Sequence, residues 1–312
     1  MDTLFREGLK ENNIEKLLSV PKSDLHNHST KGCRRKWLAE RLFVDIPEPP
    51  HKLNGLDGMQ KWFRPSIKPL CDGYENMLIR WEGAFAEAKR NNIVRLVMNF
   101  GTAEVDQTGS VEEFIKIIER YHKAYCPDTV FEAEITYPSI CDAIYEAGNM
   151  DKYVSSGYFK AIDICAGENV QPFEAFLPLY KKAEEYHMIK KIHVGETGSA
   201  EDVRRAVEIL GLSEVHHGIN ASTSKETMRF LADNQIQVNV CPSSNVMLGF
   251  AENYAVHPIK TLVENGVKVT INTDDLLIFD SSIENEYLKL YQAGTLTAEQ
   301  LDEIRCVGLG LL

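Results

Sequence analysis

The sequence has no hydrophobic run approaching the roughly 20 apolar residues that a membrane-spanning helix needs. Its beginning, MDTLFREGLKENNIEKLL, mixes charge into every turn and lacks the apolar core of a secretory signal peptide. An excess of positive charge is also missing, because 34 Lys and Arg stand against 46 Asp and Glu, for a formal net charge of −12. An acidic surface repels phosphate backbones and anionic lipids. We therefore expect no nucleic-acid polymer and no membrane among the partners, and a cytoplasmic location.

Paired cysteines are absent too. The seven cysteines are odd in number, widely scattered and never spaced as CxxC. This pattern is typical of a reduced protein with free thiols, and each thiol is expected to be a small buried hydrophobe. The chain also has no internal repeat and no glycine-rich GxGxxG after its first strand-like run, which removes the usual dinucleotide-binding signal.

The chain does contain a regular alternation of short, apolar, β-rich runs and longer amphipathic segments. Strands alternating with helices predict βαβ units and a parallel sheet. Eight such units predict an α/β fold of the closed (β/α)8, or TIM, barrel type, as one domain spanning residues 1–312. The predicted strands are 23–28, 93–101, 130–135, 159–165, 190–195, 214–218, 236–241 and 267–273, and the predicted helices include 76–90, 110–125, 172–187, 200–210 and 224–233.

Two segments fall outside this alternation. Residues 1–20 are predicted to form an N-terminal helical segment. Residues 45–75, after the first strand, are long, rich in proline and aromatic. Long connections in compact domains are often lids or binding loops. We expect a helical, lid-like insertion here, with a packing excursion over the side of the barrel as the alternative.

Histidines and acids gather where the predicted strands end. The first run closes with His26 and His28, whose spacing of two places both side chains on one face of a strand. His193 lies near the end of the fifth run, and Glu196 lies just beyond it. Barrel enzymes keep their active sites at the carboxyl ends of the strands, so these residues are expected to meet.

The sixth and eighth runs end in pairs of polar residues. His216 and His217 are adjacent, so on a regular strand they face opposite ways and at most one is expected to enter the barrel. Asp274 and Asp275 lie where the last strand breaks, so both carboxylates are expected to reach the barrel mouth. The alternative interpretation of this acidic pair is a helix N-cap, a position that Asp favours.

The types of these residues favour a mononuclear zinc hydrolase. The predicted ligands are His26, His28, His193 and Asp274, and three imidazoles with a carboxylate suit zinc while leaving a position for water. Zinc lowers the pKa of bound water from about 15.7 to about 7. Hydrolysis also needs a base and an acid, for which His217 and Glu196 are the candidates. We expect one Zn²⁺ per chain.

Seven stretches, in order along the chain, resemble the adenosine deaminase family of the amidohydrolase superfamily. Together HVGE, HHG, CPSSN and NTDD are highly specific for that family, although none is so alone. The stretches are PKSDLHNHSTKG (21–32), LDGMQKWFRPSIKP (56–69), AIDICAGE (161–168), KIHVGETG (191–198), VHHGIN (215–220), CPSSN (241–245) and INTDDLLIF (271–279).

The resemblance implies a reaction and a role for each residue. It implies zinc-dependent hydrolysis of adenosine, or of a related 6-aminopurine nucleoside or nucleotide, to the 6-oxo product and ammonia. His217 would orient and deprotonate the water, and Glu196 would protonate the purine at N1. Asp275 would hydrogen-bond N7, and the Gly167 N–H would bind N3.

The resemblance also implies apolar and substrate contacts at the mouth. An apolar gate there would exclude water and strengthen the polar contacts inside. The insertion would supply that gate with Leu56, Met59, Trp62 and Phe63. Of these, Met59 and Phe63 are predicted substrate contacts, together with Gly167 and the ligand His28.

One stretch departs from the family. Its members usually carry an Asp, followed by Gly, two residues after the second histidine, where it contacts the ribose, but here His28 is followed by Ser-Thr-Lys-Gly. The acid is missing and one residue is inserted. The basic residues Lys31, Arg34, Arg35 and Lys36 could bind a phosphate, or could form a solvated helix face. We therefore hypothesise an adenine nucleotide or a modified nucleoside as the preferred substrate.

Two other interpretations stay open. DLHNHSTKG also resembles the opening motif of PHP-type phosphoesterases, and HxH opens other amidohydrolases. Binuclear amidohydrolases need a bridging lysine at the end of the fourth strand, where this chain reads DICAG and the nearest lysine, Lys160, stands at the strand's start. The second open interpretation is a catalytically silent binding protein of the same fold. Such a protein is expected to have lost the acid, Glu196 here, or one of the metal ligands. Nucleobase deaminases with the PCxxC zinc motif are excluded, because that motif is absent.

Overall fold

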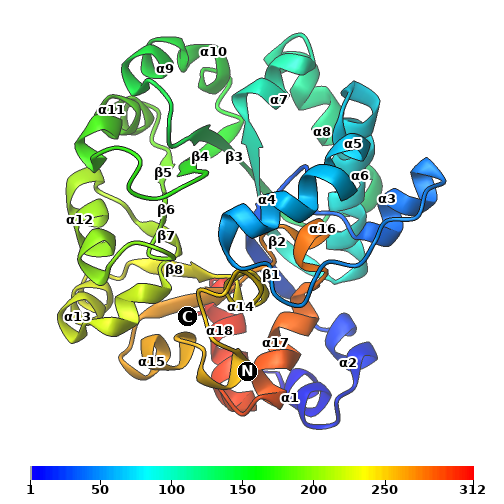
Figure 1. The fold of residues 1–312 in the computed structure, drawn as a ribbon, viewed down its shortest axis with the longest axis vertical. Coiled ribbons are helices and arrows are strands. Elements are labelled where there is room, and N and C mark those ends of the chain that lie inside the picture. The colour runs from blue at the N-terminus through cyan, green and yellow to red at the C-terminus, as the bar shows by residue number, and fades with distance from the viewer. Residues whose placement is uncertain (1) are drawn as a thin grey trace.

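The computed structural model describes residues 2–312 and has parallel strands at its centre with helices around them (Figure 1). Each strand pairs with its neighbour in parallel. In the described residues the strands are β1 (Lys22–His28), β2 (Ile93–Gly101), β3 (Val130–Pro138), β4 (Phe159–Cys165), β5 (Ile189–Lys190), β6 (His193–Val194), β7 (Glu214–His217), β8 (Gln237–Val240) and β9 (Lys268–Ile271).

These strands belong to two hydrogen-bonded sheets, β1 to β5 and β6 to β9. Because β5 and β6 are two pieces of one run, the sheets adjoin there: the Lys191 N–H donates to the Ile162 carbonyl of β4. On the opposite side, an isolated parallel bridge between Asn27 and Asp274 joins β1 to the end of β9. The strands thus take the eight positions of a (β/α)8 barrel, and the predicted fold class is confirmed.

The longer helices cover the outside of the strands (Figure 1). In α8 the buried residues Val111, Phe114, Ile117, Ile118 and Tyr121 recur every three or four positions, which places them on one face against the sheet. These outer helices are α6 (Tyr74–Arg90), α8 (Val111–Tyr125), α11 (Leu177–Glu185), α12 (Ala200–Leu210), α13 (Lys225–Asp233), α15 (Ile259–Glu264), α17 (Ile283–Gln292) and α18 (Ala298–Gly308).

Helices α1 (Thr3–Lys10) and α2 (Ile14–Ser19) lie in the segment where an N-terminal helical extension was predicted. The ring of Phe5 in α1 packs edge-on against Tyr287 of α17, with ring centres 5.2 Å apart. This contact packs the first helix against a helix near the carboxyl end of the chain. The shorter elements are α3 (Arg35–Leu42), α7 (Thr102–Gln107), α9 (Ala143–Asn149), α10 (Asp151–Val154), α14 (Pro242–Leu248), α16 (Leu276–Phe279), η1 (Phe173–Phe176), η2 (Ile219–Thr223) and η3 (Tyr254–Val256).

The insertion after β1 contains helices α4 (Gly55–Ser66) and α5 (Lys68–Cys71). An apolar cluster fastens it to the barrel, in which Leu53 and Met59 pack with Leu248 of α14 and Phe279 of α16. The Leu53 N–H also donates to the Met247 carbonyl at 2.6 Å. The predicted helical insertion is therefore present, and it is anchored on two elements that follow strands β8 and β9.

The interior of the barrel contains buried charged side chains. Lys191 lies between two carboxylates, with its Nζ 3.0 Å from Glu134 and 3.3 Å from Glu214. Lys191 and Glu134 are almost completely buried, so each charge depends on its partner for stabilisation. Burial lowers the pKa of Lys191 but the two carboxylates outweigh it, so the net shift is upward and the ammonium form is favoured.

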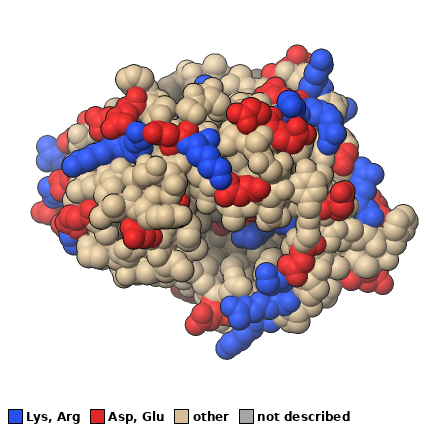
Figure 2. Space-filling model, turned by 90° about the horizontal axis from the view of Figure 1, so that it is seen from above, with Lys and Arg blue, Asp and Glu red and all other residues tan. Residues whose placement is uncertain are grey.

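On the face shown in Figure 2, acidic and basic side chains are interspersed around a hollow. Within residues 2–312, no helix combines the length and the hydropathy needed to span a bilayer. The single domain and the cytoplasmic location stay predictions.

Candidate active site

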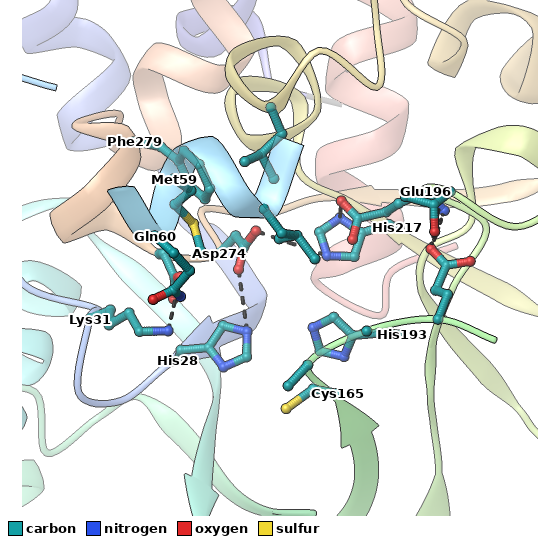
Figure 3. A pocket seen from close by; sticks show the side chains of 17 residues that line it. His28, Lys31, Met59, Gln60, Cys165, His193, Glu196, His217, Asp274 and Phe279 are labelled. Carbon is teal, nitrogen blue, oxygen red and sulfur yellow. Dashed lines mark hydrogen bonds and ion pairs between the residues drawn. The ribbon is translucent and has the colours of Figure 1, made fainter. Parts of the chain in front are cut away.

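A cavity of about 330 Å³ lies where the carboxyl ends of the strands meet. Figure 3 shows His28 and Lys31 on one side of it, Glu196 on the other, and Met59, Gln60 and Phe279 beside the helix of the insertion. Its lining residues come mainly from strand ends, the insertion and the loop after β9. They are His28, Lys31, Leu56, Met59, Gln60, Cys165, Ala166, Gly167, Glu168, His193, Glu196, Thr197, His217, Leu248, Asp274, Asp275 and Phe279.

Three of the four predicted metal ligands, His28, His193 and Asp274, line this cavity, and the fourth, His26, is buried beside them. One oxygen of Asp274 is 3.6 Å from His26 Nε2 and 3.3 Å from His28 Nε2. The ring of His193 lies 4.7 Å from that of His26 and 5.4 Å from that of His28, centre to centre. The side chains from β1, from β6 and from the end of β9 therefore lie next to one another, and His26 and His28 both approach Asp274.

Hydrogen bonds around these side chains fit a metal site. Both ring nitrogens of His26 are buried and have no hydrogen-bond partner among the described residues. A buried polar atom without a partner is costly, so a cation at this point would satisfy it. The Nδ1 atom of His193 lies 3.1 Å from Asp163 Oδ1, which leaves the Nε2 atom free. A carboxylate behind a histidine is the usual support of a zinc ligand.

A second group of acids and histidine, Glu134, Asp163 and His216, lies deeper in the barrel. It already has its own cation, because the Lys191 ammonium is 3.0 Å from Glu134. At the end of β4, where binuclear relatives need a lysine, the cavity is lined by Cys165, and Lys160 is exposed. This deeper group is therefore set apart from the histidines and acids that surround the cavity.

The expectation that only one of His216 and His217 enters the barrel is wrong. The ring of His216 lies 3.9 Å, and that of His217 5.1 Å, from the ring of His26. Strand alternation ends at His217, whose φ of +64° is in the left-handed region and turns its side chain inward. Asp274 has a similar φ, +58°, and such backbone at non-glycine residues often marks a functional site. Both predicted acids, Asp274 and Asp275, line the cavity.

Glu196 and His217 form a contact pair, with Oε1 and Nδ1 3.3 Å apart. Burial, with the charges of Asp274 and Glu168, raises the pKa of Glu196 well above its usual range, which favours the protonated acid. Burial lowers the pKa of His217 to about 3, which favours the neutral ring. The site thus holds a proton donor beside a proton acceptor.

Asn245 supports this pair and was not singled out from the sequence. Its Nδ2 lies 3.4 Å from Glu196 Oε1 and 3.3 Å from His217 Nδ1. It belongs to the CPSSN stretch, and its side chain is completely buried. The motif could have indicated it, but its contacts depend on α14 following β8 into the cavity wall.

Gly167 lines the cavity as predicted. Its φ of +121° follows a φ of +68° at Ala166, so the chain makes a sharp left-handed turn at the end of β4. Within residues 2–312 no acceptor for the Gly167 N–H is found, so this donor is available to a ligand.

Of the basic residues after His28, Lys31 is the one that lines the cavity. Its Nζ lies 3.0 Å from Asp275 Oδ2. Burial opposes the charge on Lys31, but Asp275 outweighs burial and the pKa of the ammonium is raised. Arg34, Arg35 and Lys36 line a separate hollow, where Arg34 pairs with Glu87 and Arg35 with Asp280.

Two of the four residues predicted to form an apolar gate line the cavity. Leu56 and Met59 line the cavity. Trp62 and Phe63 lie outside the lining and pack in the apolar clusters behind it. Phe63, a predicted substrate contact, therefore lies outside the cavity lining, one helical turn beyond Met59. Leu248 and Phe279 complete the apolar wall instead.

Comparison with known proteins gives matches over most of the chain. The family model described as adenosine deaminase matches residues 148–309. A protein of Treponema pallidum, provisionally described as an adenosine/adenine deaminase, is 31% identical over 296 residues, which are 94% of this chain and 99% of the relative.

Two solved structures are similar to this chain over nearly its whole length. An amidohydrolase from Burkholderia ambifaria with bound Zn superposes with a TM-score of 0.77 at 18% identity, over 100% of this chain and 88% of that one. The N6-methyl-AMP deaminase of Arabidopsis thaliana gives a TM-score of 0.76 at 15% identity, over 96% of this chain and 94% of that one. At these identities the structures support the fold alone.

Proposed function

Because the chain belongs to the adenosine deaminase family, we propose that it hydrolyses the 6-amino group of a purine and releases the 6-oxo product and ammonia. One observation carries this proposal: the Glu196 carboxyl and the His217 imidazole are in contact in a cavity that is also lined by His28, His193 and Asp274. Hydrolysis of a cyclic amidine needs a proton given to the ring and a proton taken from water.

The ligand set would hold a zinc ion through His26, His28, His193 and Asp274. When bound, zinc lowers the pKa of a coordinated water to about 7 and so supplies the nucleophile at neutral pH. The buried, unpartnered ring nitrogens of His26 support this assignment. The single ligand set supports one ion per chain.

The other residues bind the purine and move protons. Glu196 gives its proton to the ring nitrogen N1, which draws electrons from C6. His217 accepts a proton from the attacking water and passes it to the amino group, which leaves C6 as ammonia. As the 6-oxo group forms, the remaining hydroxyl proton returns to Glu196 and restores the acid. The Gly167 N–H hydrogen-bonds N3, and the Asp275 carboxyl lies at N7.

Lys31 bears on the choice of substrate. It stands near the position where the family's ribose-contacting acid is missing, and it is the basic side chain of the cavity lining. An ammonium attracts an anionic phosphate, whereas the family's acid repels one. We therefore propose an adenine nucleotide as the substrate and assign the discrimination to Lys31, which lines the cavity, since Arg34, Arg35 and Lys36 line a separate hollow.

The test is a panel of adenine, adenosine, AMP and N6-methyl-AMP, scored for release of ammonia or methylamine by the zinc-loaded protein. We expect turnover of at least one 6-aminopurine, with AMP ahead of adenosine. Faster turnover of adenosine would refute the nucleotide assignment. Phosphate release from a phosphomonoester, with no amine from any purine, would refute the deaminase and favour a phosphoesterase.

A further inference from the structure

Glu168, which directly follows Gly167 after β4, accepts an unusual set of hydrogen bonds. Its Oε1 accepts from the N–H groups of Glu196 at 2.6 Å and Thr197 at 2.9 Å. Its Oε2 accepts from those of Gly195 and Gly198, each at 2.8 Å. Each oxygen thus takes two donors, and one carboxylate binds every N–H of residues 195–198. Hydrogen bonds to an ionised acceptor are among the stronger ones in proteins.

The carbonyl side of the same loop is fixed by Asn220. Its Nδ2 donates to the Glu196 carbonyl at 3.0 Å and to the Gly198 carbonyl at 2.7 Å. Its own N–H donates to the Gly195 carbonyl at 2.9 Å. Residues 195–198 are therefore held from both sides, by a side chain after β4 and a side chain after β7.

The two glycines of the loop allow this close packing. Gly195 has a φ of +84°, and a Cβ there would lie 2.5 Å from a Val203 methyl carbon. A Cβ on Gly198 would lie 2.6 Å from Glu168 Oε2. The sequence Gly-Glu-Thr-Gly thus wraps around the Glu168 carboxylate with no room for larger residues at either end.

We propose that Glu168 is a positioning residue that sets where the Glu196 carboxyl stands relative to the Gly167 N–H. The proposal rests on the function assigned above, in which these two groups contact N1 and N3 on one edge of the purine ring. Glu168 is bonded to the Gly167 residue through the chain and to the Glu196 residue through its carboxylate. It therefore fixes the spacing between the two donors, while its own oxygens are occupied by the loop.

The proposal is tested with Glu168→Gln, which replaces one double acceptor by an amide NH₂ facing two N–H donors. We expect hydrogen exchange of the amides of residues 195–198 to accelerate at least tenfold, with zinc content unchanged. We expect kcat to fall by about 100-fold, the size of effect typical of a small misplacement of a catalytic group, while KM changes less. Glu168→Asp keeps the charge and is expected to recover part of kcat.

Two further variants make the test decisive. Glu174→Gln is the matched control, because Glu174 is a surface carboxylate paired with Arg205, and native exchange and turnover are expected. If Glu168→Gln does not fold, Asn220→Asp is the substitute. It removes the Nδ2 donor to the Glu196 and Gly198 carbonyls, and the same accelerated hydrogen exchange of the amides of residues 195–198 is expected. Native exchange at these amides in the folded variant, or an unchanged kcat, would overturn the proposal. Exchange needs no substrate, so it decides the role of Glu168 even if no purine is turned over.

Discussion

Replacing Glu196 by Gln is expected to remove activity and to stabilise the protein. The substitution keeps the size of the side chain and an oxygen that can accept from Asn245 Nδ2, 3.4 Å away in the native chain. It removes the proton that the ring nitrogen needs. General acid catalysis contributes about 10²- to 10⁴-fold, so kcat is expected to fall by that factor, or about 3–5 kcal/mol in barrier height.

The effect on stability follows from the raised pKa of the native carboxyl. Burial, followed by the charges of Asp274 and Glu168, raises the pKa of Glu196 well above its ordinary value of 4.5. Between that value and the folded pKa the unfolded chain is ionised and the folded chain is not. Stability that is present at low pH is therefore lost as pH rises, by about 1.4 kcal/mol per pH unit. Glutamine has no charge to bury, so its advantage is expected to grow with pH.

The assay is denaturant unfolding of both proteins at pH 5 and pH 8, with zinc content and ammonia release measured on the same samples. The variant is expected to bind zinc and to be inactive. The difference in free energy of unfolding, variant minus native, is expected to be larger at pH 8 than at pH 5. A variant that keeps turnover within tenfold would refute the catalytic role. A stability difference that does not change with pH would refute the raised pKa.

Three further predictions concern Lys31, the buried Lys191 and the metal. Lys31→Met is expected to lower the ratio of kcat/KM for AMP to that for adenosine by at least tenfold, with Lys31→Arg close to native, whereas an unchanged ratio would show that Lys31 does not contact the phosphate. Lys191→Met leaves the carboxylates of Glu134 and Glu214 without their cation and is expected to cost about 3–5 kcal/mol in unfolding free energy. The exposed Lys160→Met is its control, and equal stability of the two variants would contradict the ion-pair argument. Removal of metal by a chelator is expected to abolish turnover, with full recovery at one equivalent of Zn²⁺, and a requirement for two equivalents would contradict the single ligand set.

Much of the fold could be predicted because the local pattern and the tertiary structure agree. The predicted strands 93–101 and 159–165 have the observed bounds of β2 and β4, and helix 200–210 has those of α12. Each combines a continuous apolar pattern with clear end signals, such as the Ser199 side chain that caps α12. Two of the proposed ligand histidines, His26 and His28, could be paired by the same logic, since strand alternation puts them on one face.

The remaining features depend on contacts between segments that are distant in sequence. Strand 190–195 was predicted as one piece, but its hydrogen bonds to both neighbours leave only β5 and β6 as regular strand. The inward turn of His217 depends on a left-handed residue, which alternation cannot anticipate. Glu168 looked like one more acid in a motif, because its four N–H donors come from residues 27 to 30 positions further along the chain.

Position 274 shows how narrow the choice of amino acid becomes when one residue serves chemistry and architecture together. Its side chain approaches three histidines, while its backbone bridges to Asn27 at the join between β1 and β9. That join requires a φ of +58°, which Asp and Asn tolerate better than most other residues with a side chain. Asn lacks the negative charge, and Glu offers a carboxylate but tolerates the left-handed backbone less well. Redesign of the reaction would therefore start most safely from helix α4, whose Met59 and Gln60 face the cavity but take no part in that join.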